Sequence, residues 1–383
     1  MLWYPMQMYQ GRLRCCAYPN KHTTIPLQMK NVFLVSTAIL ILTGCSNNNK
    51  QDTTTLVNLN SAESIAVDST NIVQLETNDS SLLYSLGDVL FQNNKFTVIS
   101  RGNMKTFDYC GRYLNKVGSR GQGPEEYTNI NSAWITDSII YIYDSNTSKI
   151  LCYTPEGGFA GTTDVSVKSD ENIWSPSQLF YLGNGKGYLS VNTWMGGTDD
   201  VPLFSFIPPT LDSQAPVSGK LRLDGGWLND GVFVDEPNDR VLYWEGFRDT
   251  VYTVDQAAGL SPLFVFDFGD KSLPQEIKSD NDLYNRVGKI QEAGDSVYAY
   301  ARYIQVHNGN IYALTTLGSD IYIIKIDEKS KESKSYKLTF ADNRYVPSSF
   351  MKLRGDSLAI GVYDKTDTEK NPAIVFIPLS DLK

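Results

Sequence analysis

The chain has 383 residues, its aromatic content is 12% with 23 tyrosines, and its formal net charge is −9. This length and composition fit one large all-β domain, because aromatic residues favour strands and all-β domains often exceed the average domain length. The acidic balance argues against a nucleic-acid partner, since binding to a phosphate backbone depends on lysine and arginine side chains.

The N-terminal stretch is typical of a targeting sequence. Met29 and Lys30 begin a short basic segment, which an apolar run and then Leu-Thr-Gly-Cys follow. The run is too short to span a membrane and has the length of a secretory signal, so we predict a signal peptide over residues 29–44. Residues 1–28 do not fit a signal peptide. We interpret them as an upstream extension, with Met29 as the true start.

The Leu-Thr-Gly-Cys ending resembles the lipobox of bacterial lipoproteins. The resemblance implies that Cys45 carries the lipid and that the protein is attached to the outer membrane, on a side that the sequence leaves open. An ordinary cleaved signal with a chance cysteine is the alternative. Residues 45–54 are polar and predict a flexible tether.

The rest of the chain contains six repeated units, each with a polar turn, an apolar strand, a second turn and another strand. The units begin near Asn94, Asp137, Gly185, Asp239, Asn308 and Asp356, at intervals of about 43 to 69 residues. This spacing predicts a six-bladed β-propeller over residues 55–383, with an insertion at residues 271–286 in the fourth unit. Strand-like residues within 62–77 form no complete blade, so we predict that an N-terminal strand completes the last blade.

Between the first two units, residues 118–124 contain three glycines and a proline. They predict a tight, ordered loop, because glycine permits unusual backbone angles and proline cannot donate to a strand ladder. Four stretches of the chain resemble a family of lipid-anchored six-bladed propellers. They are the run Arg-Gly-Gln-Gly-Pro-Glu-Glu-Tyr, the segments 248–254 and 263–269, and the Asn-Pro-Ala-Ile-Val-Phe-Ile-Pro-Leu run near the C-terminus. These NHL-like lipoproteins belong to Gram-negative gut bacteria. The resemblance implies the fold and the anchor. The family often has glycine where this chain has Glu125.

The sequence offers few groups for catalysis. His307 is the only histidine after Cys45, and it lies in a predicted turn. The sequence contains no Gly-x-Ser-x-Gly nucleophile motif, and it contains neither the His-Glu-x-x-His nor the paired Cys-x-x-Cys pattern of zinc sites. We expect no cofactor, although a single calcium ion in the propeller channel is left open because its ligands are ordinary oxygens. We predict no disulfide between Cys110 and Cys152.

Candidate ligand-binding residues come from the ordered loop and from tryptophans near unit boundaries. They are Arg120, Gln122, Glu125, Tyr127, Trp134, Trp174 and Trp194. Loops on one face of a propeller converge on its channel, and aromatic rings offer flat faces to sugars or proteins. The alternative is that the loop charges are solvated and that the rings pack between blades.

We therefore expect a monomeric, non-catalytic binding or scaffold module for a glycan, a peptide or a protein partner. The alternative is a channel-centred lactonase, lyase or glycoside hydrolase, with or without calcium. Propellers support both kinds of function, so the fold alone does not decide between them.

Overall fold

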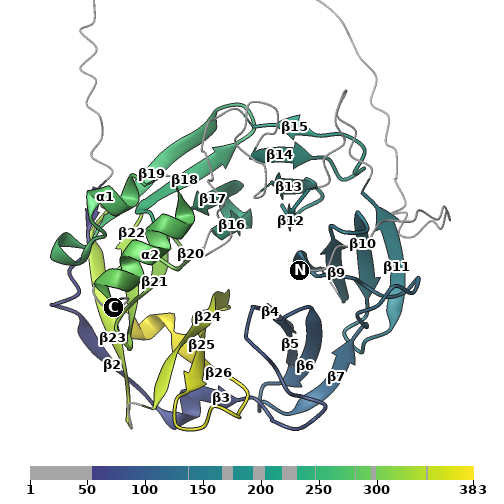
Figure 1. Cartoon of the computed structure of the whole chain (residues 1–383), viewed down its shortest axis with the longest axis horizontal. Helices are drawn as coiled ribbons and strands as arrows, with labels where there is room; N and C mark the ends of the chain where they lie inside the picture. The colour runs from purple at the N-terminus through teal and green to yellow at the C-terminus, as the bar shows by residue number, and fades with distance from the viewer. Residues whose placement is uncertain are drawn as a thin grey trace, which may run out of the picture. The chain divides into compact units, whose positions relative to one another are not determined.

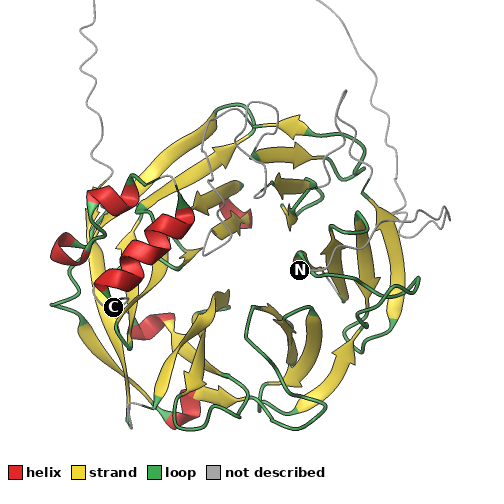
Figure 2. Cartoon of the chain, in the orientation of Figure 1, coloured by secondary structure: helices red, strands yellow, loops and turns green. Residues whose placement is uncertain are grey.

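Six antiparallel sheets are arranged in a ring, with one strand of each sheet facing the centre (Figures 1 and 2). The structure is a computed structural model that describes residues 54–136, 138–165, 176–192, 203–217, 231–245, 247–280, 282–294, 299–341 and 344–383. The predicted six-bladed β-propeller is confirmed.

The blades follow one another along the chain, and the first strand of each is the innermost. Blade I contains β4 (Asp88–Phe91), β5 (Lys95–Ser100), β6 (Asn103–Asp108) and β7 (Tyr113–Val117). Blade II contains β8 (Ser132–Thr136), β9 (Ile139–Asp144), β10 (Lys149–Tyr153) and β11 (Phe159–Asp164). Blade III contains β12 (Gln178–Tyr181), β13 (Tyr188–Val191), β14 (Phe204–Ile207) and β15 (Ala215–Pro216). Blade IV contains β16 (Gly231–Asp235), β17 (Arg240–Trp244), β18 (Thr250–Asp255) and β19 (Gly259–Asp267). Blade V contains β20 (Tyr303–His307), β21 (Asn310–Leu317), β22 (Asp320–Asp327) and β23 (Ser333–Phe340). Blade VI contains β24 (Tyr345–Arg354), β25 (Ser357–Asp364) and β26 (Ala373–Pro378).

Three short N-terminal strands run along the outside of the last three blades. Strand β3 (Ile72–Gln74) pairs antiparallel with β26 and supplies the fourth strand of blade VI, which confirms the predicted closure. Strands β1 (Thr54–Leu56) and β2 (Glu63–Val67) instead add fifth, parallel strands to blades IV and V. The segment therefore covers three blade edges that would otherwise be open to pairing with another chain.

The blades are held together by apolar side chains on both faces of each sheet. In β9, Ile140 and Ile142 pack in the cluster between blades I and II, whereas Tyr143 packs in the cluster between blades II and III. The alternation arises because successive side chains of a strand point to opposite faces of the sheet.

The insertion in the fourth unit is helical. Short turns η3 (Gly269–Lys271) and α1 (Gln275–Lys278) precede α2 (Leu283–Ala293), and all three lie between β19 and β20. Ile277 and Ile290 pack with Phe247 and Tyr300 in a separate apolar cluster, which fixes the helices to the ring. Three other short 3-10 turns are η1 (Ser69–Asn71), η2 (Glu236–Asn238) and η4 (Leu379–Asp381).

Candidate functional site

The predicted loop between blades I and II is closed on itself by hydrogen bonds. Tyr127 N donates to Ser119 O at 3.1 Å, and Gly121 N donates to Tyr127 O at 3.0 Å. The Glu126 carboxylate folds back and accepts from Gly123 N at 2.8 Å. A Cβ atom on Gly121 would lie only 1.9 Å from the same carboxylate, so this glycine is needed for close approach and not for a positive φ.

The end of the loop is fixed in the core. Tyr127 has no exposed surface, and its ring meets that of Tyr153 edge to face at 6.2 Å. Burial raises the pKa of Tyr127 to about 12. The buried carboxylate of Asp144 accepts from Thr128 N at 2.6 Å and from Asn146 N at 3.1 Å. These contacts tie the loop to blade II.

Three of the four candidate residues on the loop face solvent. Gln122 is exposed, and Arg120, also exposed, donates from Nε to Thr128 O at 3.0 Å. Glu125 has an exposed side chain, and its backbone carbonyl accepts from the Tyr153 hydroxyl at 2.8 Å. The fourth candidate, Tyr127, lies in the core.

The propeller has an axial channel between its innermost strands. Its volume is about 540 Å³, and residues from all six innermost strands line it. Its aromatic lining consists of Trp134, Phe180, Tyr181, Phe233, Trp244, Tyr303 and Phe350. Several of these rings are only half-buried, so the channel presents apolar faces beside polar side chains.

The polar lining of the channel has both satisfied and free groups. Lys352 Nζ lies 3.1 Å from the Asp88 carboxylate, and Gln305 Oε1 accepts from Leu353 N at 3.1 Å. Gln178 is a half-buried lining residue, and among the described residues the indole N–H of Trp244 has no hydrogen-bond partner. Trp244 is only 4% exposed, so this unpaired donor is buried beside the channel.

Trp134 is the one tryptophan candidate that lies among the described residues. Its ring stacks on Tyr141 at 5.5 Å and on Tyr181 at 6.1 Å, and it meets Tyr188 edge-on at 5.5 Å. It therefore belongs both to the channel lining and to the packing between blades II and III. Trp174 and Trp194 lie outside the described residues.

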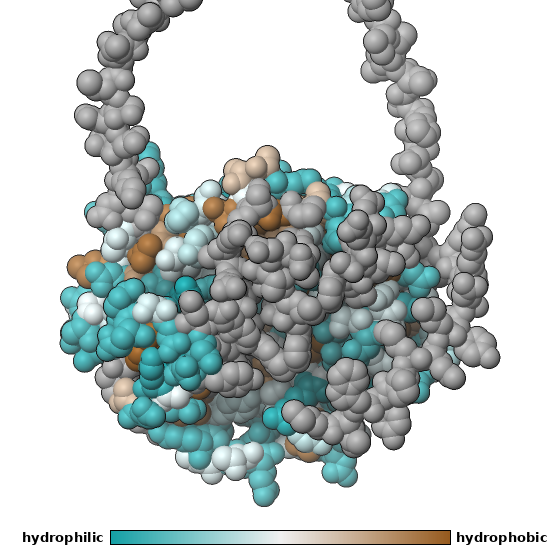
Figure 3. All heavy atoms as spheres, turned by 45° about the horizontal axis from the view of Figure 1, so that its top comes forward, coloured by the Kyte–Doolittle hydropathy of each residue, from teal (hydrophilic) through white to brown (hydrophobic). Residues whose placement is uncertain are grey.

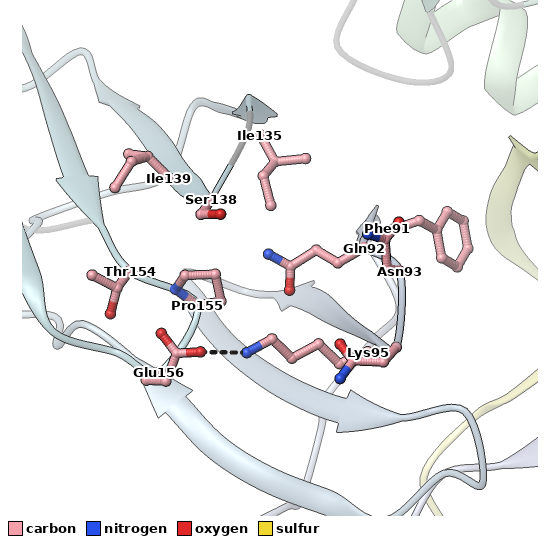
Figure 4. Close-up of a pocket in the computed structure, with 11 residues that line it drawn as sticks. Phe91, Gln92, Asn93, Lys95, Ile135, Ser138, Ile139, Thr154, Pro155 and Glu156 are labelled. Carbon is pink, nitrogen blue, oxygen red and sulfur yellow. Dashed lines mark hydrogen bonds and ion pairs between the residues drawn. The ribbon is translucent and has the colours of Figure 1, made fainter.

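A second hollow, of about 660 Å³, opens at the seam between blades I and II (Figure 4). An ion pair of 2.6 Å between Lys95 and Glu156 crosses it, and the hydrogen bond from Lys95 lowers the pKa of Glu156. The Gln92 amide points toward Pro155 and Ser138 on the opposite wall. Its Oε1 atom is buried and has no hydrogen-bond partner among the described residues.

Groups suited to metal binding or nucleophilic catalysis are sparse in the part of the chain that the structure describes. No three His, Cys, Asp or Glu side chains there lie close enough together to hold a metal ion. His307 lies at the end of β20, where its Nε2 is 3.2 Å from Asp356, and it does not line the channel. Cys110 is exposed and Cys152 is buried, and no disulfide joins these two described cysteines. No helix in the described ranges has the length and apolarity to cross a membrane.

Sequence reasoning did not single out the channel residues Asp88, Gln178, Gln305 and Lys352. Each is an ordinary polar residue on an innermost strand, and these strands are far apart in the sequence. Their shared position, a few residues before the start of a repeated unit, was the available signal.

Comparison with known proteins supports the fold and assigns a family. The fold is similar to that of a Bacteroides fragilis NCTC 9343 protein described as a candidate exported protein, with 17% identity, a TM-score of 0.59, and coverage of 85% of this chain and 99% of the other. It is also similar to a DUF4221 family member from Bacteroides vulgatus, with 10% identity, a TM-score of 0.55, and coverage of 80% of this chain and 95% of the other.

At these identities the similarity shows the fold alone, and no curated protein matches the chain. The family model for the domain of unknown function DUF4934 matches residues 47–376. Because this match spans most of the sequence, the chain belongs to the DUF4934 family.

Proposed function

We propose that the protein is an exported, lipid-anchored binding module whose axial channel holds a neutral, hydroxyl-rich ligand of the glycan class. The observation that carries the proposal is the channel lining, where half-buried aromatic rings alternate with amide side chains. Its volume of about 540 Å³ lies within the range of small-molecule sites, which is about 300–1,000 Å³.

The chemistry of the lining suits sugar hydroxyl groups. The half-buried aromatic rings of the lining offer apolar surface against which the C–H face of a pyranose can pack. The Gln178 amide can donate and accept hydrogen bonds at once, as a hydroxyl group requires.

The charges of the lining favour binding over catalysis. Among the described lining residues, Asp88 is the one acid and Lys352 the one base, and they pair with each other. Hydrolysis of a glycosidic bond by the usual route needs two carboxyl groups, and the described lining supplies one. A neutral ligand fits best, because it leaves the Asp88–Lys352 pair intact.

Attachment to the outer membrane through Cys45 is part of the same proposal. It is supported by the signal-like sequence that ends in Leu-Thr-Gly-Cys. We expect cells fed with labelled palmitate to incorporate the label into the protein, and Cys45→Ala to abolish incorporation. Incorporation that persists in the variant would contradict the anchor.

The channel site is tested with two matched variants, Gln178→Ala in the channel and Gln122→Ala on the loop. A panel of neutral oligosaccharides is screened by thermal unfolding of the full chain, with and without EDTA. A ligand at 100 times its Kd stabilises the native state by about 2.7 kcal/mol. We expect Gln178→Ala to weaken binding of the active sugar about fivefold to tenfold, the loss of one hydrogen bond, and Gln122→Ala to leave it unchanged.

Three results would overturn the proposal. Weakening by Gln122→Ala alone would place the ligand on the loop. A response that EDTA abolishes would show a metal-dependent site. Chemical conversion of the bound sugar, detected by chromatography, would show that the protein is an enzyme.

A further inference from the structure

Four basic side chains gather at one end of blade I without acidic partners. Lys105 on β6 and Lys116 on β7 lie directly opposite each other in the sheet. Arg101 precedes β6, and a Cβ atom on the neighbouring Gly102 would lie 3.9 Å from Nη1 of Arg120. No ion pair joins any of the four to an acidic residue in the described ranges.

This cluster of like charges destabilises the folded state. Like charges directly opposite each other on neighbouring strands are destabilising. Lys105 Nζ donates only to a neutral group, the carbonyl of Leu82, at 2.7 Å. Burial and the charge of Lys116 lower the pKa of Lys105. Although the chain as a whole is acidic, no ion pair neutralises the cluster within the described ranges.

Blade V provides an internal contrast. Lys325 and Lys334 also face each other across β22 and β23. There, Asp327 and Glu332 line the same hollow as the two lysines, together with Lys331 and Lys383, so acidic groups lie nearby although basic groups are in excess. In the described ranges, the lysine pair of blade I shares no hollow with acidic side chains and forms no ion pair with one.

Exposed apolar side chains border the basic cluster. Tyr84 is 68% exposed and Leu82 is 43% exposed, although the visible described surface of the molecule is largely hydrophilic (Figure 3). The Arg101 guanidinium lies 5.9 Å from the centre of the Tyr84 ring, and Lys105 contacts Leu82. Tyrosine and arginine together are the side chains enriched at the energetic centres of protein interfaces.

We propose that Leu82, Tyr84, Arg101, Lys105, Lys116 and Arg120 form a docking surface for a protein partner that presents acidic residues around an apolar side chain. None of the six lines the axial channel, so this surface is independent of the proposed glycan site. A local acidic patch fits better than a long polyanion, because the net charge of −9 repels a polyanion beyond the cluster.

The proposal makes opposite predictions for stability and binding. Lys116→Glu turns a repulsive cross-strand pair into an attractive one, so the melting temperature should rise by a few degrees. The same change should weaken an acidic partner at least tenfold. Lys334→Glu is the matched control in blade V, and it should leave binding unchanged.

The probe is a soluble glutamate–tyrosine copolymer, which is titrated against the full-length protein and compared with polyglutamate and polygalacturonate. We expect the copolymer to bind most tightly, to weaken as salt rises, and to lose affinity in Lys116→Glu and in Tyr84→Ser. Absence of copolymer binding, or binding that Lys116→Glu leaves unchanged, would overturn the proposal. Tighter binding of polygalacturonate would also overturn it, in favour of an acidic glycan. If Lys116→Glu lowers the melting temperature, Arg101→Gln replaces it and must weaken the copolymer.

Discussion

The loop from Gly118 to Tyr127 and the axial channel differ in how their polar groups are used. In the loop, the backbone and the Glu126 carboxylate satisfy one another, and the final tyrosine is buried. In the channel, the half-buried Gln178 side chain lines the hollow, and the Trp244 indole N–H lacks a partner among the described residues. The loop has the stronger sequence motif, but the channel has the polar side chains that are available to a ligand.

The difference follows from the separation of the contacts along the chain. The hydrogen bonds that close the loop join residues within ten positions of one another, so a short motif encodes the whole conformation. The channel is assembled from six strands that come from six separate repeats. No short stretch of sequence can carry its pattern.

The largest effect that tests this contrast is expected from Tyr127→Ala. Because the ring is fully buried, its removal should leave a cavity and cost about 3–5 kcal/mol of the free energy of unfolding. Urea denaturation measures the loss. Gln122→Ala, on the exposed side of the same loop, is the control and should change stability by less than about 0.5 kcal/mol. A loss below about 1 kcal/mol for Tyr127→Ala would mean that the ring is not a core residue.

An intermediate effect is expected from Gly121→Ala, because the new Cβ atom must displace the Glu126 carboxylate. The displaced side chain would lose its bond from Gly123 N, at a cost of about 1–3 kcal/mol. In a Glu126→Ala background the same substitution should cost much less, since the atom that it meets is gone. Equal costs in both backgrounds, measured as a double-mutant cycle, would show that Gly121 serves another purpose.

The sequence predicted the parts of the fold that carry local, repeated signals. The six repeated apolar runs are the second strands of the six blades, and these strands are apolar because neighbouring blades cover both of their faces. The innermost strands were harder to recognise because their channel-facing positions are polar or mixed. The pairing of β1 and β2 with blades IV and V was missed, since parallel pairing over more than 200 residues leaves no local pattern.

The smallest effect concerns the ionisation of Tyr127. It tests whether the buried end of the loop is excluded from solvent. A tyrosine in the unfolded chain ionises near its ordinary pKa of 10.0, whereas burial holds the pKa of Tyr127 at about 12 in the folded protein. A raised pKa contributes stability below pH 10, and this contribution is lost as the pH rises toward 12, because only the unfolded state then releases its proton. Tyr127→Phe removes the ionisable group, so the stability of the wild type relative to this variant should fall by about 1 kcal/mol between about pH 9 and about pH 11. Urea denaturation of both proteins across this range tests the expectation. A constant difference would mean that the hydroxyl reaches water, and the loop would then resemble the channel more closely than its hydrogen bonds indicate.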